Sequence, residues 1–223
     1  MKKIELIKAE KDGLKIKSEL QRFAKEGWES ISEEDIQRLK WYGLFLRNPT
    51  PGFFMLRVRI PNGFTVSHQV RMLACIAEIY GNGVIDITTR QQVQLRQLKI
   101  ENIPKVFDLL EEIGLTSCQT GMDNVRNIMG CPVAGLNPKE KVDAHSLIKA
   151  LNEHILGNPE FSNLPRKFNI TLSGCPDDCV HAETQDLALV PAVQEMGGES
   201  VDGFNVLVGG KLGSGGYRIA TSL

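Results

Sequence analysis

The chain has 223 residues, of which 42% are apolar, 24% charged and 6% aromatic. This composition is that of an ordinary globular protein, and it excludes collagen-like, disulfide-scaffold and low-complexity classes. With 26 basic and 27 acidic residues, the net charge of -1 gives no overall attraction to nucleic acid or to an anionic membrane. Any anion site must therefore be a local arrangement of residues.

The N-terminal sequence and the cysteines indicate the compartment. The first residues break into charges where a signal peptide would need an apolar run. No window approaches the roughly 18 uncharged apolar residues of a membrane span. Five cysteines, an odd number spread widely, suit a reducing compartment better than a disulfide framework. We therefore expect a soluble cytoplasmic protein with no nucleic-acid or membrane partner.

The first half of the chain predicts two segments. Residues 1–47 are charged and indicate an N-terminal helical segment, which ends at the prolines and glycine of 48–52. Residues 48–120 then predict six elements. In chain order these are a strand at 53–60, a helix at 66–80, strands at 84–88 and 92–98, a helix at 103–113 and a short last strand at 115–119. This β-α-β-β-α-β order is that of a ferredoxin-like half-domain, with both helices on one face of the sheet.

Residues 121–223 have a different character. A long loop rich in glycine, asparagine and proline covers 121–138, and long loops of this kind are often functional. The pattern then predicts a helix over 139–156 and strands at 167–173, 187–190 and 204–208. The expected fold class is α+β, in which the ferredoxin-like half-domain precedes part of a mixed α/β domain.

Strand alternation gives the polar residues a direction. If Val93 and Leu95 face the helices, the polar residues around them point to the helix-free face. These residues are Arg90, Gln92, Gln94 and Arg96, and Arg57 and Arg59 of the first strand point the same way. A later strand presents Lys167 and Asn169, and the long loop adds Asn124, Arg126 and Asn127. Such residues could hold a polyanionic cofactor and a small anion together. From the pattern alone, the solvated face of a half-exposed sheet is the commoner explanation.

The cysteines give a weaker signal. Cys175 and Cys179 have a C-x3-C spacing, which is half of a zinc or iron–sulfur site. The further ligands available are Cys118 and Cys131, each from a different segment. Free cysteines are more often small buried residues, so Cys175 and Cys179 are weak metal candidates. The glycines of 209–216 do not follow the order of a P-loop.

Four motifs together carry a specific resemblance. They occur in the order T-T-R-Q-Q-V-Q-L-R at 88–96, D-N-V-R-N at 123–127, L-P-R-K-F-N at 164–169 and G-F-N-V-L-V-G-G at 203–210. With these motifs the chain resembles the N-terminal half of ferredoxin-dependent nitrite reductases, in the siroheme nitrite/sulfite reductase family. The resemblance runs from about residue 41 to the C-terminus.

The resemblance implies siroheme as cofactor, coupled in the family to a 4Fe-4S cluster, and ferredoxin as electron donor. The implied reaction is the six-electron reduction of nitrite to ammonia, and the alternative is that of sulfite to sulfide. The implied catalytic residues are Arg90, Arg126, Lys167 and Asn169. The implied cofactor-binding residues are Gln94, Arg96, Asn124, Asn127, Arg166, Gly209 and Gly210. Sulfite reductases more often show a second lysine where Asn169 stands, which favours nitrite.

One departure from the family limits this interpretation. The family's cluster ligands, a C-x5-C followed by a C-x3-C, belong to its second half, and this chain stops before them. We therefore expect residues 121–223 to be a truncated part of the siroheme domain, inactive without a complementary second-half chain that brings the cluster. A non-catalytic tetrapyrrole-binding or partner-docking module is an alternative, and the related cobalamin-pathway oxygenases are another.

Overall fold

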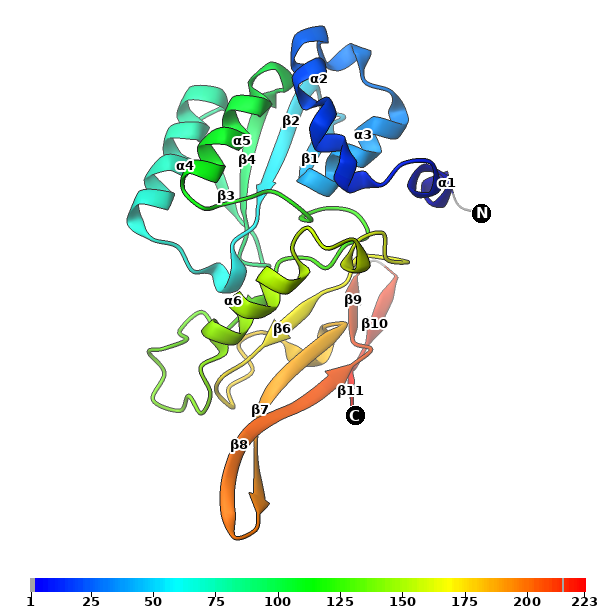
Figure 1. Ribbon diagram of the computed structural model, residues 1–223. Coiled ribbons are helices and arrows are strands. Elements are labelled where there is room, and N and C mark those ends of the chain that lie inside the picture. The colour runs from blue at the N-terminus through cyan, green and yellow to red at the C-terminus, as the bar shows by residue number, and fades with distance from the viewer. Residues whose placement is uncertain (1–2, 214) are drawn as a thin grey trace. The chain divides into compact units, whose positions relative to one another are not determined.

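The described residues form a four-stranded sheet and a five-stranded sheet, each with its own helices, and a small two-stranded ribbon (Figure 1). The computed structural model describes residues 3–213 and 215–223. Unit 1 consists of Met1–Ile60, Phe64–Asn124 and Leu156–Lys167, and unit 2 consists of Pro61–Gly63, Val125–Ile155 and Phe168–Leu223. Among the described residues, no helix has both the length and the apolar character needed to cross a membrane.

Unit 1 contains a four-stranded antiparallel sheet in the order β1-β2-β4-β3. Its strands are β1 (Leu44–Arg47), β2 (Thr50–Val58), β3 (Ile85–Ile87) and β4 (Val93–Lys99). Helices α4 (Ser67–Tyr80) and α5 (Ile103–Glu112) cover one face of the sheet (Figure 1). Alternate residues of β2, namely Phe54, Leu56 and Val58, point into the core between the sheet and these helices. This arrangement confirms the expected ferredoxin-like fold. The predicted stripe of α5 is buried with them.

Two expectations for unit 1 were wrong. The strand expected at 115–119 is reduced to one bridge, in which the Arg59 N–H donates to the Thr116 carbonyl at 2.7 Å. The segment then turns, because the Thr120 hydroxyl donates to the Ser117 carbonyl at 2.8 Å. The segment expected to be helical to residue 47 instead ends in β1, which pairs with the edge of β2 (Phe45 opposite Met55). The open edge of a strand offers unpaired backbone N–H and C=O groups with which another segment can pair. The local sequence pattern of that segment does not reveal this pairing.

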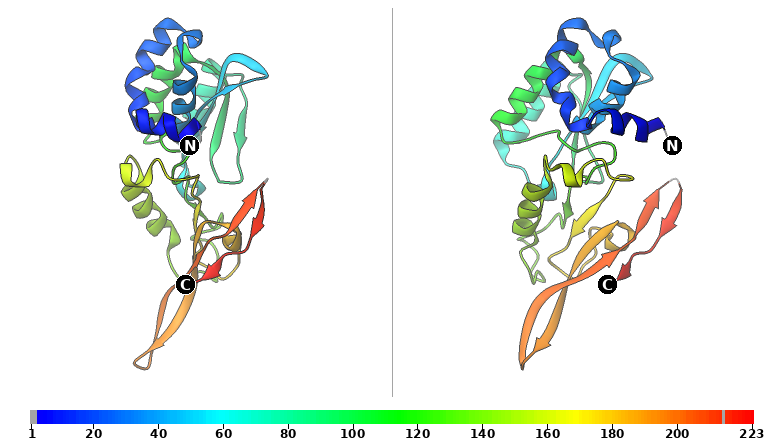
Figure 2. Two further views of the ribbon diagram at one scale, coloured as in Figure 1. Left: turned by 90° about the vertical axis from the view of Figure 1, so that its right-hand side faces the viewer. Right: turned by 45° about the vertical axis from the view of Figure 1, so that its right-hand side comes forward.

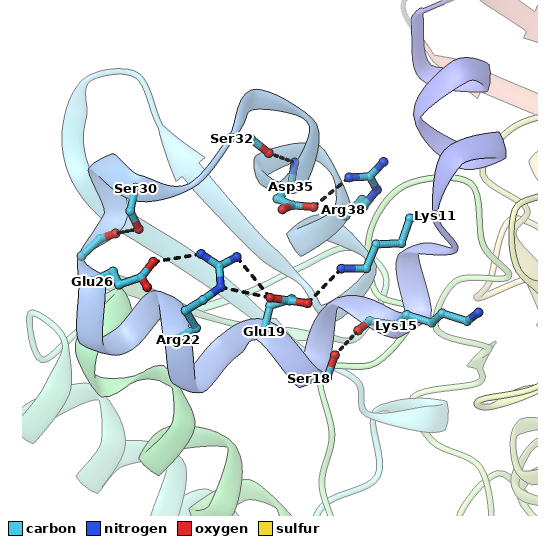
Figure 3. A network of polar contacts seen from close by, with 11 residues as sticks. Lys11, Lys15, Ser18, Glu19, Arg22, Glu26, Ser30, Ser32, Asp35 and Arg38 are labelled. Carbon is cyan, nitrogen blue, oxygen red and sulfur yellow. Dashed lines mark hydrogen bonds and ion pairs between the residues drawn. The ribbon is translucent and has the colours of Figure 1, made fainter.

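The N-terminal part of unit 1 is a series of short helices joined by charged contacts (Figure 3). The α-helices are α1 (Lys3–Glu10), α2 (Leu20–Glu26) and α3 (Glu33–Leu39). Glu19 accepts hydrogen bonds from Lys11 and Arg22 at 3.2 and 3.1 Å, and the Ser32 hydroxyl caps α3 by accepting from the Asp35 N–H at 3.1 Å. Such exposed pairs add little stability. The segment is held mainly by its apolar side chains, which join the core of the sheet.

Short 3-10 helices connect the larger elements. They are η1 (Gly13–Glu19), η2 (Trp28–Ser30), η3 (Lys40–Tyr42), η4 (Pro61–Gly63), η5 (Ile100–Asn102), η6 (Pro159–Phe161) and η7 (Ala182–Thr184). Their role is to change the chain direction at the ends of strands and helices.

Unit 2 contains a five-stranded sheet in the order β11-β8-β7-β6-β5. The strands are β5 (Met129–Gly130), β6 (Ile170–Leu172), β7 (Leu187–Met196), β8 (Glu199–Val208) and β11 (Thr221–Ser222). Helix α6 (Ala144–Ile155) and a small ribbon of β9 (Lys211–Gly213) and β10 (Gly216–Arg218) complete the unit. Strands β5, β6 and β7 are parallel, whereas β7 and β8 form an antiparallel hairpin.

The β7–β8 hairpin extends well past the strands expected at 187–190 and 204–208 (Figure 2). Its two strands are joined by Gly197 and Gly198, which have φ angles of 64° and 87°. Two successive glycines with positive φ make the tight turn that matches the twist of a hairpin. The pairing continues without a break from Leu187–Val208 to Met196–Glu199. The glycines therefore form a turn within one ribbon rather than a loop between two short strands.

A close contact in unit 1 gives the first prediction. Trp41 is fully buried, and its indole N–H donates to the Ser162 hydroxyl at 3.1 Å. A Cβ atom at Gly13 would lie 2.2 Å from the Trp41 ring. Gly13→Ala should therefore lower the free energy of unfolding by about 1–3 kcal/mol, the usual cost of overpacking. Urea denaturation measures this, with Gly203→Ala as control, because a Cβ there meets nothing within 4 Å. Equal stability of the two variants would contradict the predicted clash.

Candidate functional site

The helix-free face of the unit 1 sheet carries a row of polar side chains. Arg57 on β2 is paired with Gln94 on β4, and Gln94 is paired in turn with Asp86 on β3. The Arg96 side chain, two residues further along β4, forms an ion pair with Asp86. Because directly paired residues point to the same face, strand register gathers these groups in one place. This is the direction that strand alternation predicted for Gln94 and Arg96.

A tight turn before β4 presents Arg90. The Thr88 hydroxyl accepts hydrogen bonds from the backbone N–H groups of Arg90 and Gln92 at 3.3 and 3.2 Å. The Thr88 N–H donates to the Gln92 carbonyl at 2.9 Å, and Gln91 adopts a φ angle of 56°. A threonine hydroxyl that bonds nearby backbone groups is a common way to fix a turn. The side chain of Arg90 therefore projects from a defined turn at the start of β4.

The arginines of this face repel one another. Burial, together with the positive charges of Arg90 and Arg96, lowers the pKa of Arg57 to about 10. Its guanidinium lies 4.9 Å from the centre of the Phe45 ring, and Nη1 donates to the Thr120 carbonyl at 3.2 Å. Within the described structure, Arg57 Nε and Gln92 Nε2 are buried without a hydrogen-bond acceptor. Buried donors of this kind call for an explanation, and an anion with several acceptor atoms would supply one.

Arg59, the other arginine expected on this face, is fully buried. Its side chain is 1% exposed, and Nη1 lies 3.4 Å from the Gln119 carbonyl. Burial lowers the pKa of Arg59 to about 10. β2 ends at Val58, and the following bridge to Thr116 lays the 116–120 segment close to the arginine. Val58 and Ile60 on either side of Arg59 both join the core of the sheet, so alternation continues through Arg59, and what it does not predict is the cover by the 116–120 segment.

A second group of predicted residues lies on unit 2. The Arg126 N–H donates to the Phe168 carbonyl at 2.9 Å, so the segment of Arg126 and Asn127 runs beside that of Asn169. The Asn169 N–H donates to the Asp186 carboxylate at 2.9 Å. Arg126 and Asn169 are largely buried, at 9% and 8% exposure, and Asn127 is fully buried. Two neighbouring backbone segments thus bring a cation and two amides together.

Asp186 connects Asn169 to the predicted glycine pair. Besides the carboxylate contact with Asn169, the Asp186 carbonyl accepts from the Gly209 N–H at 3.0 Å. A Cβ atom at Gly210 would lie 2.3 Å from the Gln185 carbonyl, so the chain can pass there only as glycine. Gly209 has a φ angle of 83°, which also favours glycine. The glycines therefore hold the end of β8 close to the segment of Asn169.

The remaining predicted residues lie on unit 1. Asn124 is fully buried, its amide donates to the Gly121 carbonyl at 2.7 Å, and its oxygen accepts from the Ser162 hydroxyl at 2.8 Å. These contacts fix the loop around Asn124 within unit 1. Lys167 is half-buried and Arg166 is exposed. The predicted site residues thus form two groups, Arg90, Gln94, Arg96, Asn124, Arg166 and Lys167 on unit 1 and Arg126, Asn127, Asn169, Gly209 and Gly210 on unit 2.

Three residues were missed when the site was read from the sequence. Arg57 was placed on the correct face but not assigned to the site, although its partner Gln94 was. Asp86 and Asp186 were not singled out, and they contact Arg96 and the Asn169 backbone. The signal available for Arg57 was strand pairing, because the residue opposite a site residue shares its face. Contacts of Asp186 depend on the long-range pairing of β6 and β7 and leave no local signal.

The described residues contain no group of three or more Cys, His, Asp or Glu side chains arranged to hold a metal ion. Cys175 is buried and Cys179 is exposed. The donor set present in the described part of the chain therefore does not fit a 4Fe-4S cluster, which takes four cysteine thiolates.

Comparisons with known proteins assign both parts of the chain to known domain families. The family model for the nitrite/sulfite reductase ferredoxin-like half domain matches residues 47–113, and that for the nitrite and sulphite reductase 4Fe-4S domain matches 121–223. The ferredoxin–nitrite reductase of Leptolyngbya laminosa is 52% identical over 94% of this chain, and the chloroplastic enzyme of Oryza sativa is 47% identical over 82%. The chain spans 42% and 31% of those proteins.

A solved structure is also similar. The Mycobacterium tuberculosis NirA protein matches with a TM-score of 0.89 and 27% sequence identity. The match covers 98% of this chain and 42% of that one. The backbone likeness therefore extends over nearly the whole chain, including both groups of predicted residues.

The position of Asp186 gives a second prediction. Asp186→Ala removes a charged acceptor from the Asn169 N–H, and the free energy of unfolding should fall by about 1.5–3 kcal/mol. Asp202→Ala is the matched control, since the same charge is removed from an exposed position of β8, with an expected effect within about 0.5 kcal/mol. Chemical denaturation of both variants measures the difference. A loss at Asp186 no larger than that at Asp202 would show that this contact does not stabilise the segment.

Proposed function

Because the chain belongs to the nitrite and sulphite reductase family, we propose that it is the siroheme- and anion-binding half of an assimilatory ferredoxin-dependent nitrite reductase. The chain spans about two-fifths of the length of the relatives matched along most of its own length. The observation that carries the proposal is the positive face of unit 1, where Arg57, Arg90 and Arg96 repel one another and two buried donors have no acceptor.

The residues of this face fit a polycarboxylate tetrapyrrole. A guanidinium forms two parallel hydrogen bonds with a carboxylate, and Arg57 Nε and Gln92 Nε2 are donors that need an acceptor. We therefore assign Arg57, Arg90 and Arg96 to the carboxylates of siroheme, with Gln92 and Gln94 as amide partners. Siroheme, when bound, would supply an iron that binds nitrite and passes on the electrons of the donor. An anion there would also offset the repulsion by Arg90 and Arg96, which adds to the effect of burial in lowering the pKa of Arg57.

The residues proposed to act on the substrate anion are Arg126 and Asn169 on unit 2 and, separately, Lys167 on unit 1. Lysine is a compact, mobile charge, so the Lys167 ammonium can donate a hydrogen bond or a proton to an oxygen of nitrite. Arg126 adds a second cation, and its backbone is fixed by the Phe168 carbonyl. Asn169 is neutral where sulfite-reducing relatives more often carry a lysine, which favours nitrite over sulfite. Sulfite reduction is the alternative within the same family.

The 4Fe-4S cluster and the ferredoxin contact are proposed to lie on a complementary part that corresponds to the rest of the relatives' length. The five cysteines of this chain include no C-x5-C pair, and its described residues offer no cluster-binding group. In this proposal the assembled protein works in the cytoplasm with ferredoxin as donor. The chain alone binds siroheme and substrate but has no path for electrons from ferredoxin.

Siroheme binding by the 223-residue chain tests the proposal. We expect one siroheme per chain by absorbance titration and no ammonia from nitrite under reducing conditions. Arg57→Gln should weaken binding tenfold or more, since a charge-assisted hydrogen bond is worth about 1.5–3 kcal/mol. Arg47→Gln is the matched control, because Arg47 is exposed on the same sheet. Equal affinity of the two variants would refute the assigned face, and steady ammonia formation by the chain alone would refute the need for a second part.

Lys167 gives a test of the anion site. In the enzyme assembled with its second part, Lys167→Ala should lower kcat about 10²-fold, the usual effect of removing one such donor. Its siroheme content should stay unchanged, because the assigned cofactor contacts are elsewhere. Lys149→Ala removes an exposed lysine and serves as control. Activity within twofold of the parent at equal siroheme content would remove Lys167 from the proposed site.

A further inference from the structure

A lysine of the first helix is buried inside unit 1. The Lys8 side chain on α1 is 6% exposed, and its Nζ donates to the Asp123 carboxylate at 3.1 Å and to the Leu164 carbonyl at 2.9 Å. The Glu5 carboxylate, one helical turn earlier, lies 2.8 Å from the same nitrogen. A lysine is buried in this way only when its charge is paired. Helix α1 precedes both segments that the family models match, and its sequence predicted no part in the site.

The Lys8 ammonium joins two segments that are distant in the sequence. The Leu164 N–H donates to the Asp123 carbonyl at 2.8 Å, so the two backbones are already in direct contact. Lys8 adds a second link, from the carboxylate of Asp123 to the carbonyl of Leu164. All three residues belong to unit 1. We name this junction of Lys8, Asp123 and Leu164 the Lys8 clamp.

The Lys8 clamp lies directly before residues assigned to the site. Asn124 follows Asp123, and Lys167 follows Leu164 after two residues, the first of which is Pro165. The proline ring fixes its own φ angle and restricts Leu164 to extended conformations. The connection from the clamp to Lys167 is therefore short and stiff. A displacement of Leu164 would carry over to the half-buried Lys167 side chain.

The Lys8 clamp has a fixed base and a lasting charge. Arg38 of α3 donates to the Ile7 carbonyl at 3.0 Å and to the Glu10 carboxylate at 2.7 Å, which holds α1 next to α3. The Ile7 side chain is buried as well. Burial acts to lower the pKa of Lys8, but the two carboxylates beside it outweigh burial and raise that pKa above its ordinary value. Lys8 is therefore a permanent cation at neutral pH.

We propose that Lys8 is a positioning residue that acts on the substrate anion through Lys167. Its bonds to Asp123 and Leu164 fix the point at which the stiff connection to Lys167 begins, and with it the reach of the Lys167 ammonium. The N-terminal segment thereby takes part in the reaction without contacting the substrate. The link to the substrate rests on the proposed function, whereas the hold of Lys8 on Lys167 does not.

Amine labelling of the chain without cofactor tests the hold of Lys8 on Lys167. Trace acetic anhydride followed by peptide mass spectrometry gives the labelling rate of Lys167 relative to that of Lys149, which is exposed on α6. In Lys8→Met, Lys167 should label about threefold faster, because a segment that opens more often exposes its side chains. Lys8→Arg keeps a charged donor and should return the rate toward that of the parent.

Two control variants separate the Lys8 clamp from surface charge and from stability. Lys3→Met removes the exposed ion pair of the same helix with Glu33 and should leave the labelling of Lys167 unchanged. Leu73→Ala removes a buried side chain of α4 and destabilises the core without removing a clamp contact. Labelling of Lys167 in Lys8→Met at the parent rate would overturn the proposal. Labelling that is equally fast in Leu73→Ala would reduce Lys8 to a general contribution to stability.

Nitrite titration of the siroheme-loaded chain, followed by absorbance, tests the link to the substrate. Lys8→Met should weaken nitrite binding about tenfold at equal siroheme content, because a misplaced donor is costly. If Lys8 acts through Lys167, the double variant Lys8→Met/Lys167→Ala should bind nitrite as Lys167→Ala does. Additive losses would refute this route. A parent chain that takes up no siroheme would refute the proposed function, and the labelling rates would still decide whether Lys8 positions Lys167.

Discussion

The pairing of β2 with β4 is the constraint on which the positive face of unit 1 depends. In the observed register Leu56 is opposite Leu95 and Arg57 is opposite Gln94, so the apolar residues enter the core while the polar ones face away. A slip of one residue would exchange the two faces and bury the arginines against α4 and α5. Core packing therefore fixes the position of the charges. The fully buried side chains Phe54, Leu56 and Leu95 offset the cost of holding like charges close together.

Those like charges are a local departure from what stability alone favours. Arg96 has an acidic partner in Asp86, but Arg57 has only a backbone carbonyl and an aromatic ring. A buried arginine with a lowered pKa and a donor without an acceptor costs stability in the absence of a ligand. Groups of this kind tend to gather at functional sites. Arg38 also has a buried Nε without an acceptor among the described residues, but its charge is compensated, because its guanidinium is paired with Asp35 and Glu10.

Sequence patterns predicted features that depend on local periodicity. The alternation of β2 and β4 and the apolar stripe of α5 are read directly from spacing, and with them the helix-free face that carries Arg57, Gln94 and Arg96. What failed depends on pairing between distant segments. β1 forms because the edge of β2 is available, and Arg59 is buried because residues 116–120 pass close to it. The contact of Asp186 with the Asn169 backbone also spans two strands that only the fold brings together.

In unit 2 the backbone, rather than side-chain periodicity, defines the candidate site. Arg126 and Asn169 are placed by backbone hydrogen bonds to Phe168 and Asp186, and Gly210 passes where any side chain would meet the Gln185 carbonyl. These contacts lie next to the parallel strands β5, β6 and β7, whose pairing sets the spacing of the segments that carry Arg126 and Asn169. Arg126 and Asn169 therefore keep their places only as long as β6 stays paired with both of its neighbours, although none of the three strands contains either residue.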